Sequence, residues 1–122
     1  FPEVPKSWKN NALAEKWLTI KDVRKSVLEA IEPLRASKEL GSSLEARPVI
    51  AVSDKALFES VDMADICITS QVEIKDGDGG VTIEKAGGEK CCRCWKVLPE
   101  VSPETELCNR CESAVESVKK AA

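Results

Sequence analysis

Two Cys-x-x-Cys pairs, at residues 91–94 (CCRC) and 108–111 (CNRC), limit what this chain can fold into. Each pair can present two sulfur atoms from one tight turn, and two such turns complete the tetrahedral shell of a Zn²⁺ ion. Four protein ligands leave no open position for water, so an ion held in this way is structural rather than catalytic. The spacing predicts one structural Zn²⁺ bound by Cys91, Cys94, Cys108 and Cys111.

Other cysteine chemistries fit the sequence less well. A disulfide framework needs an oxidising compartment, and no secretion signal is visible in the sequence. A redox dithiol normally starts a helix within an α/β domain, whereas these pairs lie among Gly, Pro and charged residues. An iron–sulfur or rubredoxin-like iron site uses the same ligands and stays open as an alternative. Cys92 points away from the metal if Cys91 and Cys94 bind it, although a register that uses Cys92 is also open. Cys67 is interpreted as a small packed residue.

The composition removes several classes of function. The chain has no histidine, which excludes Ser-His-Asp and Cys-His catalysis and every zinc site that contains histidine. Its 18 basic and 21 acidic residues give a formal charge of −3, so bulk charge does not favour nucleic acid, although a local basic patch can. No apolar run approaches the ~20 residues of a membrane span. Because the first residue is Phe1 rather than Met, we expect a piece of a longer protein.

The residue pattern before the cysteines predicts an α+β fold that begins with a long helix. An extended arm with Pro2 and Pro5 precedes the helix, for which Asn11 is the expected N-cap. Pro33 lacks a backbone donor and should kink or break the helix, and Gly41 suits the position just past its end. Apolar residues recur at spacings of three and four, which places them on one face: Leu13, Trp17, Ile20, Val23, Val27, Ile31 and Leu34.

A small sheet with a β-hairpin and one short helix should follow. Residues 47–52 read as a strand, and Ser53 or Asp54 can cap a helix over 55–61. The run 65–74 (DICITSQVEI) alternates in polarity, with Ile66, Ile68, Val72 and Ile74 on one side, and predicts a strand with one buried face. DGDGG at 76–80 predicts a turn, since Gly87 stands where a calcium loop needs Glu, and VTIEK at 81–85 completes the hairpin.

Three parts of the chain follow from these elements. Residues 1–41 form the arm and long helix, residues 42–87 a small α+β junction, and residues 88–122 a four-cysteine zinc module that ends in a short amphipathic helix or a fraying tail. Because the core near the cysteines is small, we expect residues 89–111 to need the metal in order to fold.

Basic and aromatic residues gather on the two knuckles themselves. Arg and Lys can meet phosphates and Trp can stack on a base, although a Trp95 packed over the metal lobe and solvated charges on the helix are equally compatible with the sequence. The candidates for nucleic-acid contact are Lys90, Arg93, Trp95, Lys96 and Arg110 on the knuckles, with Arg35 and Lys38 on the long helix.

These motifs resemble the C-terminal region of bacterial isoleucyl-tRNA synthetases. KCCRCWK (90–96) and ELCNRC (106–111) are similar to that family's zinc-binding pattern, roughly K-C-x-R-C-W and then C-x-R-C. Residues 23–50 are similar to the segment after its anticodon-binding helices, and the opening FPEVP and the run DICITSQVEI fit the family's order. Cys92 and Pro33 depart from the pattern. The matching points in residues 23–50 are Arg24, Val27, Glu32, Arg35, Lys38, Gly41, Ser43, Leu44, Glu45 and Ala46.

The resemblance implies a fragment of a class I aminoacyl-tRNA synthetase that uses isoleucine, ATP and tRNA(Ile). The histidine pair and KMSKS-like loop of that family are missing here, so the fragment is not catalytic and ATP is bound elsewhere in the full-length enzyme. The implied partners are tRNA(Ile), held at its anticodon side, and the upstream catalytic, editing and anticodon-binding domains of the same polypeptide. We expect a cytoplasmic monomer without membrane contact.

Two other functions stay open at this point. A free-standing zinc ribbon that binds DNA or a protein partner would carry the same four cysteines, although it would have no need for residues 23–50. A purely structural cap would pack against the synthetase and touch no RNA.

Overall fold

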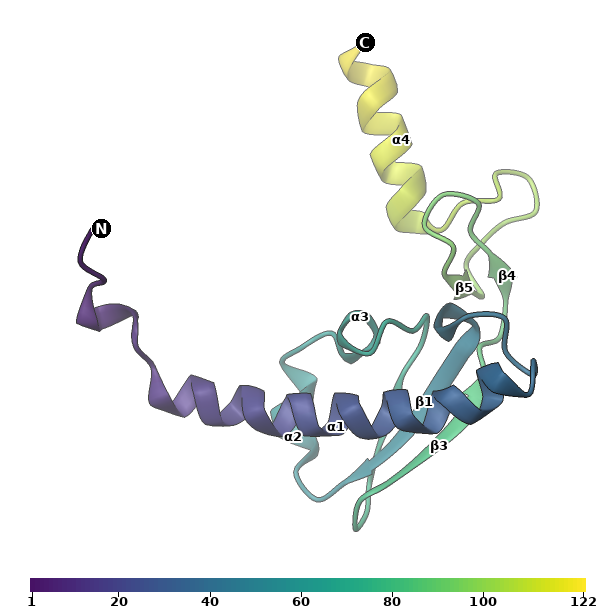
Figure 1. Ribbon diagram of the computed structural model, residues 1–122. Helices are drawn as coiled ribbons and strands as arrows, with labels where there is room; N and C mark the ends of the chain where they lie inside the picture. The colour runs from purple at the N-terminus through teal and green to yellow at the C-terminus, as the bar shows by residue number, and fades with distance from the viewer.

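The long helix α1 spans Asn11–Ala36 in a computed structural model that describes residues 1–122 (Figure 1). An exposed arm with the short 3-10 helix η1 (Lys6–Trp8) precedes it. The N-cap is Asn10 rather than the predicted Asn11, since the Asn10 side chain accepts a hydrogen bond of 3.0 Å from the backbone N–H of Leu13. The shift of one residue places an amide oxygen over the otherwise unpaired N–H groups of the first turn.

The helix does not break at Pro33 and continues to Ala36. A proline at this position leaves the carbonyl of Glu29 without its helical partner, but both residues are exposed, so water can bind that carbonyl. Lys38, with a φ of 62°, ends the helix in place of the predicted Gly41. Its N–H bonds to the Arg35 carbonyl at 3.1 Å, and the next N–H reaches Leu34 at 3.0 Å, which is a Schellman cap.

The sheet has the strand order β2-β1-β3, with β1 (Ala46–Val52) in the centre. It runs parallel to β2 (Glu73–Asp76) and antiparallel to β3 (Gly80–Lys85). The α+β class is confirmed, but the predicted hairpin of residues 73–85 is wrong, because β1 lies between its two strands. The turn between β2 and β3 lies at the predicted position, residues 76–80, and passes over the end of β1. There the Gly77 N–H donates a 3.1 Å hydrogen bond to the Val52 carbonyl. The most apolar strand thus takes the central position, and the charged strands form the edges.

The predicted strand over residues 65–74 forms only from Glu73 onward. Its first two residues end the helix α3 (Met63–Ile66), and residues 67–72 form a turn and an irregular segment. Asp62 caps this helix by accepting a hydrogen bond from the Asp65 N–H. Ile68 then has a φ of 57° and a half-exposed side chain, so the alternation does not face a core there. The hydroxyl of buried Thr69 is satisfied by backbone carbonyls, which competes with strand pairing.

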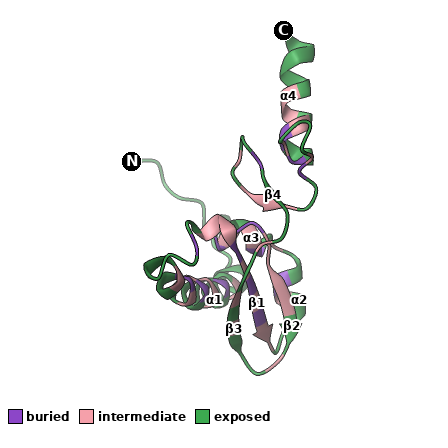
Figure 2. Ribbon diagram, turned by 90° about the vertical axis from the view of Figure 1, so that its right-hand side faces the viewer, coloured by how far each residue is buried: buried purple, intermediate pink, exposed green.

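One apolar core joins α1, β1 and the short helices α2 (Lys55–Glu59) and α3. Alternate residues of β1 point into it, and Figure 2 shows buried, purple segments along β1. The opposite face of the sheet carries Arg47, which pairs with Glu73 and Glu84. Cys67 packs in this core, which agrees with its interpretation as a small packed residue. It lies at the end of α3, however, and not in a strand. The buried members are Ile20, Val27, Ile31, Leu40, Ala46, Ile50, Phe58, Met63 and Cys67.

A second lobe begins at residue 88 and contains the four cysteines of the two Cys-x-x-Cys motifs. The strands β4 (Glu89–Lys90) and β5 (Val97–Leu98) pair antiparallel, and the helix α4 (Asn109–Ala121) projects away from the sheet (Figure 1). The tail is therefore a helix of 13 residues rather than a fraying end. No helix in the chain is both long enough and apolar enough to cross a membrane. We refer to residues 1–86 as the body and to residues 88–122 as the metal lobe.

Candidate metal centre and its basic rim

The sulfur atoms of the two Cys-x-x-Cys pairs converge at one point of the metal lobe. The four atoms lie within 4.8 Å of one another, and Cys94 Sγ is 3.8 Å from Cys108 Sγ. Zinc–sulfur bonds of about 2.3 Å in a tetrahedron separate neighbouring sulfurs by about 3.8 Å, so the cluster matches the size that such an ion requires. All the cysteines are free thiols, which is inconsistent with a disulfide framework. The residues present therefore fit a tetrahedral metal ion held by Cys91, Cys94, Cys108 and Cys111.

The first knuckle is the turn between β4 and β5. The Trp95 N–H bonds to the Cys91 carbonyl and the Cys91 N–H bonds to the Lys96 carbonyl, both at 2.9 Å, which closes the turn around the two sulfurs. Trp95 adopts a φ of 68°, the left-handed conformation that lets the chain reverse so tightly. Local backbone geometry thus presents both sulfurs of this knuckle on the same side.

The second knuckle is the beginning of α4. Cys108 is the N-cap of this helix, and its carbonyl accepts the first helical hydrogen bond from Glu112 at 2.9 Å. The Cys108 N–H points to Cys91 Sγ at 3.4 Å and joins the two knuckles. Glu100 accepts hydrogen bonds from the Asn109 N–H at 3.3 Å and from its side-chain amide at 2.9 Å. Glu100 belongs to no motif, so sequence reasoning missed this support.

The thiols of the cluster differ strongly in proton affinity. Burial raises the pKa of Cys91, but hydrogen bonds from backbone N–H groups, including those of Cys94 and Cys108, outweigh it and lower the pKa to about 6. Burial raises the pKa of Cys94 to about 12, with hydrogen bonds from the neighbouring thiols adding to the effect. Four adjacent thiolates would repel one another, and a bound divalent cation is what allows all four to lose their protons.

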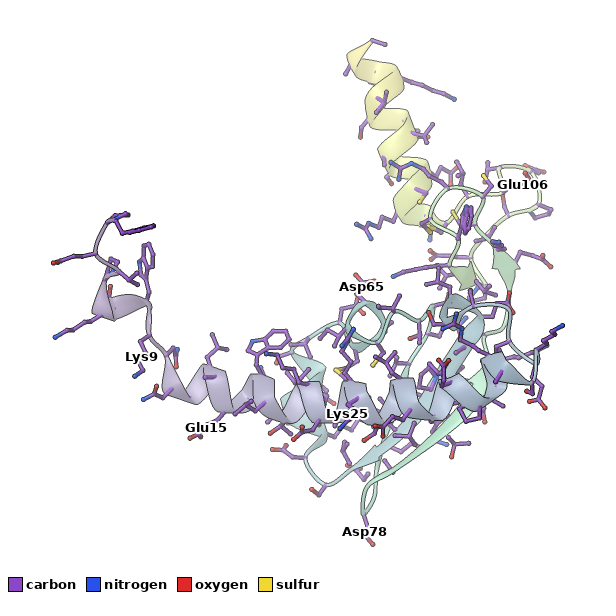
Figure 3. The ribbon with its side chains drawn as sticks, in the orientation of Figure 1. Lys9, Glu15, Lys25, Asp65, Asp78 and Glu106 are labelled. Carbon is purple, nitrogen blue, oxygen red and sulfur yellow. The ribbon has the colours of Figure 1, made fainter.

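The two remaining cysteines lie outside the cluster. Cys92 is exposed, and its backbone N–H bonds to the Glu106 carbonyl at 2.9 Å, which ties the first knuckle to the loop that carries Glu106 (Figure 3). A ligand register that uses Cys92 is therefore not the arrangement in this structure. Cys67 is in the body, where burial raises its pKa to about 11.

The basic candidates on the knuckles have different surroundings. Lys90 Nζ lies 4.6 Å from the centre of the Trp95 ring, and 60% of Trp95 is exposed, so the ring does not pack over the metal. Arg93 Nη1 donates to Cys111 Sγ at 3.6 Å, and this contact raises the pKa of Arg93. Arg110 is exposed in the first turn of α4. These side chains form a basic rim beside the cluster, which we define as Lys90, Arg93, Trp95 and Arg110.

Three other candidates lie outside this rim. Lys96 turns toward the body, where its ammonium group pairs with Asp65 of α3, and only 22% of its side chain is exposed. Arg35 Nη1 is 3.6 Å from Glu32 at the end of α1, and Lys38 is exposed in the cap that follows. No local pattern indicates the Lys96–Asp65 pair, because its partners are 31 residues apart.

Comparison with known proteins identifies relatives along most of the chain. No protein-family model matches it. The isoleucine–tRNA ligase of Zymomonas mobilis subsp. mobilis is 47% identical over 119 residues, which cover 94% of this chain and 12% of the relative. That of Brucella abortus is 39% identical over 88% of this chain and 13% of the relative. That of Mesorhizobium japonicum is 42% identical over 83% of this chain and 12% of the relative.

The chain thus spans about one eighth of the length of the curated relatives it matches. Identity at this level, along almost the whole chain and with several ligases, agrees with the resemblance carried by the cysteine knuckles and by residues 23–50. The chain therefore belongs to the isoleucine–tRNA ligase family.

Proposed function

We propose that this chain is the non-catalytic, C-terminal tRNA-binding region of an isoleucine–tRNA ligase. One structural Zn²⁺, bound by Cys91, Cys94, Cys108 and Cys111, would shape the metal lobe so that its basic rim meets the anticodon side of tRNA(Ile). The observation that carries the proposal is the convergence of four sulfur atoms within 4.8 Å beside exposed basic and aromatic side chains. Residues 1–41 would end the anticodon-binding region, residues 42–87 form the junction and residues 88–122 the zinc module.

Zinc is proposed because four thiolates in a closed tetrahedron suit it, and iron is the alternative that the same donor set can hold. When bound, the ion supplies no chemistry beyond fixing the two knuckles relative to each other. Metal analysis of the purified full-length ligase tests the assignment: one zinc per chain supports it. Stoichiometric iron with the visible absorption of an iron–thiolate centre contradicts it.

The basic rim supports contact with RNA through two kinds of side chain. Arg93 and Arg110 can bind phosphate oxygens, and the exposed Trp95 ring offers a flat surface on which a base can stack. Lys96 has a weaker case, because its charge is already paired with Asp65. Arg35 and Lys38 at the end of α1 would add phosphate contacts from the body.

The remaining functions of the ligase are proposed for the rest of the polypeptide. Isoleucine and ATP would be bound, and editing performed, by upstream domains, with which this chain would form one cytoplasmic, monomeric enzyme. This division is in keeping with the absence of histidine from the chain and with the eightfold greater length of the relatives.

Charge reversal in the full-length ligase tests the proposed tRNA contact. R93E combined with R110E should raise the KM for tRNA(Ile). The slope of the logarithm of the tRNA-binding constant against the logarithm of the salt concentration should also become shallower, by about 0.7–0.9 for each phosphate contact that is lost. Formation of isoleucyl-adenylate should not change, because it needs no tRNA. K25E, on the exposed surface of α1, is the matched control. Because Arg93 also donates to Cys111 Sγ, the comparison is made on double variant protein that retains its zinc. With zinc retained, a purely structural cap predicts that the double variant binds tRNA as the control does.

A further inference from the structure

The chain crosses from the body to the metal lobe only once, through Ala86, Gly87 and Gly88. Gly87 is exposed, with no neighbouring atom where a side chain would begin, whereas Gly88 packs directly against the Leu98 backbone of the lobe. The larger apolar core and the core around the cysteines share no residue. A glycine link without an apolar interface leaves the orientation of the lobe free unless other contacts fix it.

Polar side chains of the body supply such contacts. The Ser70 hydroxyl donates to the Leu44 carbonyl of the body and accepts a 2.7 Å hydrogen bond from the Val97 N–H of β5. The Gln71 amide donates to the Val97 carbonyl at 3.1 Å and to the Gly87 carbonyl at 2.8 Å. Both backbone polar groups of Val97 are therefore held by side chains of the body, directly after the first knuckle.

The Ser70 and Val97 contacts are partly buried and are connected to α1. Ser70 is only 5% exposed, so replacing its hydroxyl would remove the hydrogen-bond partner of both the Leu44 carbonyl and the Val97 N–H at a partly buried site. Next to them, Lys96 pairs with Asp65 of α3. The same helix is bound to α1 by a 2.9 Å hydrogen bond from Arg24 Nε to the Ile66 carbonyl. The lobe is thus joined through α3 to the longest helix of the body.

We propose that Ser70 and Gln71 are positioning residues that fix the orientation of the metal lobe and hence the place where its basic rim meets tRNA. The second half of this inference rests on the proposed function. A lobe that is free to turn about Gly87 would have to be ordered each time tRNA binds, and this ordering would weaken binding without changing any group that touches the RNA.

The test uses S70A and Q71E in the full-length ligase. Q71E keeps the shape of the side chain but replaces the donor that faces two carbonyls with an acceptor. S26A is the matched control, because the Ser26 hydroxyl bonds only within α1. In S70A the amide hydrogen of Val97 should exchange about tenfold faster or more. Zinc content and adenylate formation should stay at wild-type values, while the KM for tRNA(Ile) rises about 2- to 10-fold at unchanged kcat.

The possible results separate this inference from the proposed function. Unchanged exchange at Val97 in both variants means that these residues do not hold the lobe, and the inference fails. A second result also overturns the inference: exchange at Val97 becomes faster and the KM for tRNA stays unchanged, although charge reversal of Arg93 and Arg110 raises the KM. The proposed function then stands. If that reversal has no effect on tRNA either, the proposed function fails and the positioning role fails with it. Should S70A not fold, Q71E decides alone, since Gln71 is only partly buried.

Discussion

Loss of one sulfur ligand should unfold the metal lobe and leave the body folded. Of the four buried residues in the core of the lobe, three are cysteines, and Val101 is the remaining one. Full burial of a valine side chain contributes about 1.5–3 kcal/mol, whereas structural zinc contributes about 10–16 kcal/mol to the folding of small metal domains. The metal term is several times larger, so C108S should abolish the ordered lobe. C108S should lower zinc affinity by more than the loss of about 10- to 100-fold that follows when a residue hydrogen-bonded to a metal ligand is changed.

Hydrogen exchange with mass spectrometry, together with metal analysis of the same sample, measures this effect in the full-length ligase. In C108S, the amides of residues 89–111 should exchange at rates close to those of an unstructured chain, while those of α1 and β1 stay protected by their separate core. C92S is the matched control, because Cys92 is a neighbouring thiol outside the cluster. A lobe that keeps its protection after confirmed loss of zinc would refute the reasoning, since its small apolar core would then be sufficient for folding.

Three further results are expected. In the native zinc-loaded ligase, iodoacetamide should alkylate exposed Cys92 at neutral pH and leave Cys67 unmodified while the body stays folded. Cys67 is fully buried, and its burial raises the thiol pKa to about 11, so little of the reactive thiolate forms; equal labelling of both at neutral pH would contradict this. I31A should lower the free energy of unfolding of the body by about 2–5 kcal/mol, and L18A, at an exposed site on the same helix, by less than about 0.5 kcal/mol; similar losses would disprove the placement of the core. G88A should reduce zinc retention and the protection of the β4 amides from hydrogen exchange, because a Cβ there would lie 2.2 Å from the carbonyl carbon of Leu98 and the φ of 117° disfavours alanine. Wild-type zinc content and exchange would show that the backbone at Gly88 is not constrained.

The sulfur cluster and the long helix were within reach of sequence reasoning because both depend on local spacing. A Cys-x-x-Cys turn brings its own sulfurs together, and only the meeting of two turns requires the fold. The periodic apolar face of α1 correctly included the buried residues Ile20, Val27 and Ile31. It also included Leu13 and Trp17, which remain partly exposed, since periodicity indicates a face but not how far its partner extends.

The sheet order and the role of residues 65–72 were out of reach for physical reasons. Two alternating strand segments separated by a glycine turn favour a hairpin locally, and the insertion of β1 between them is decided by long-range burial. Alternation in DICITSQVEI imitates a strand, while the Asp62 cap and the hydroxyls of Thr69 and Ser70 direct the chain elsewhere. Nothing in the pattern indicates that Ser70 and Gln71 contact Val97 of β5, which is 27 and 26 residues away from them.

The central position of β1 has a consequence for the order in which the chain can assemble during its synthesis. This strand is made first, but its two neighbours begin only at Glu73 and Gly80, so both of its edges stay unpaired while the intervening residues emerge from the ribosome. An apolar strand with two open edges is a template for pairing with other chains. A product truncated before β2 would expose the sequence ARPVIAV permanently, so premature termination here should yield aggregating fragments rather than a smaller folded domain.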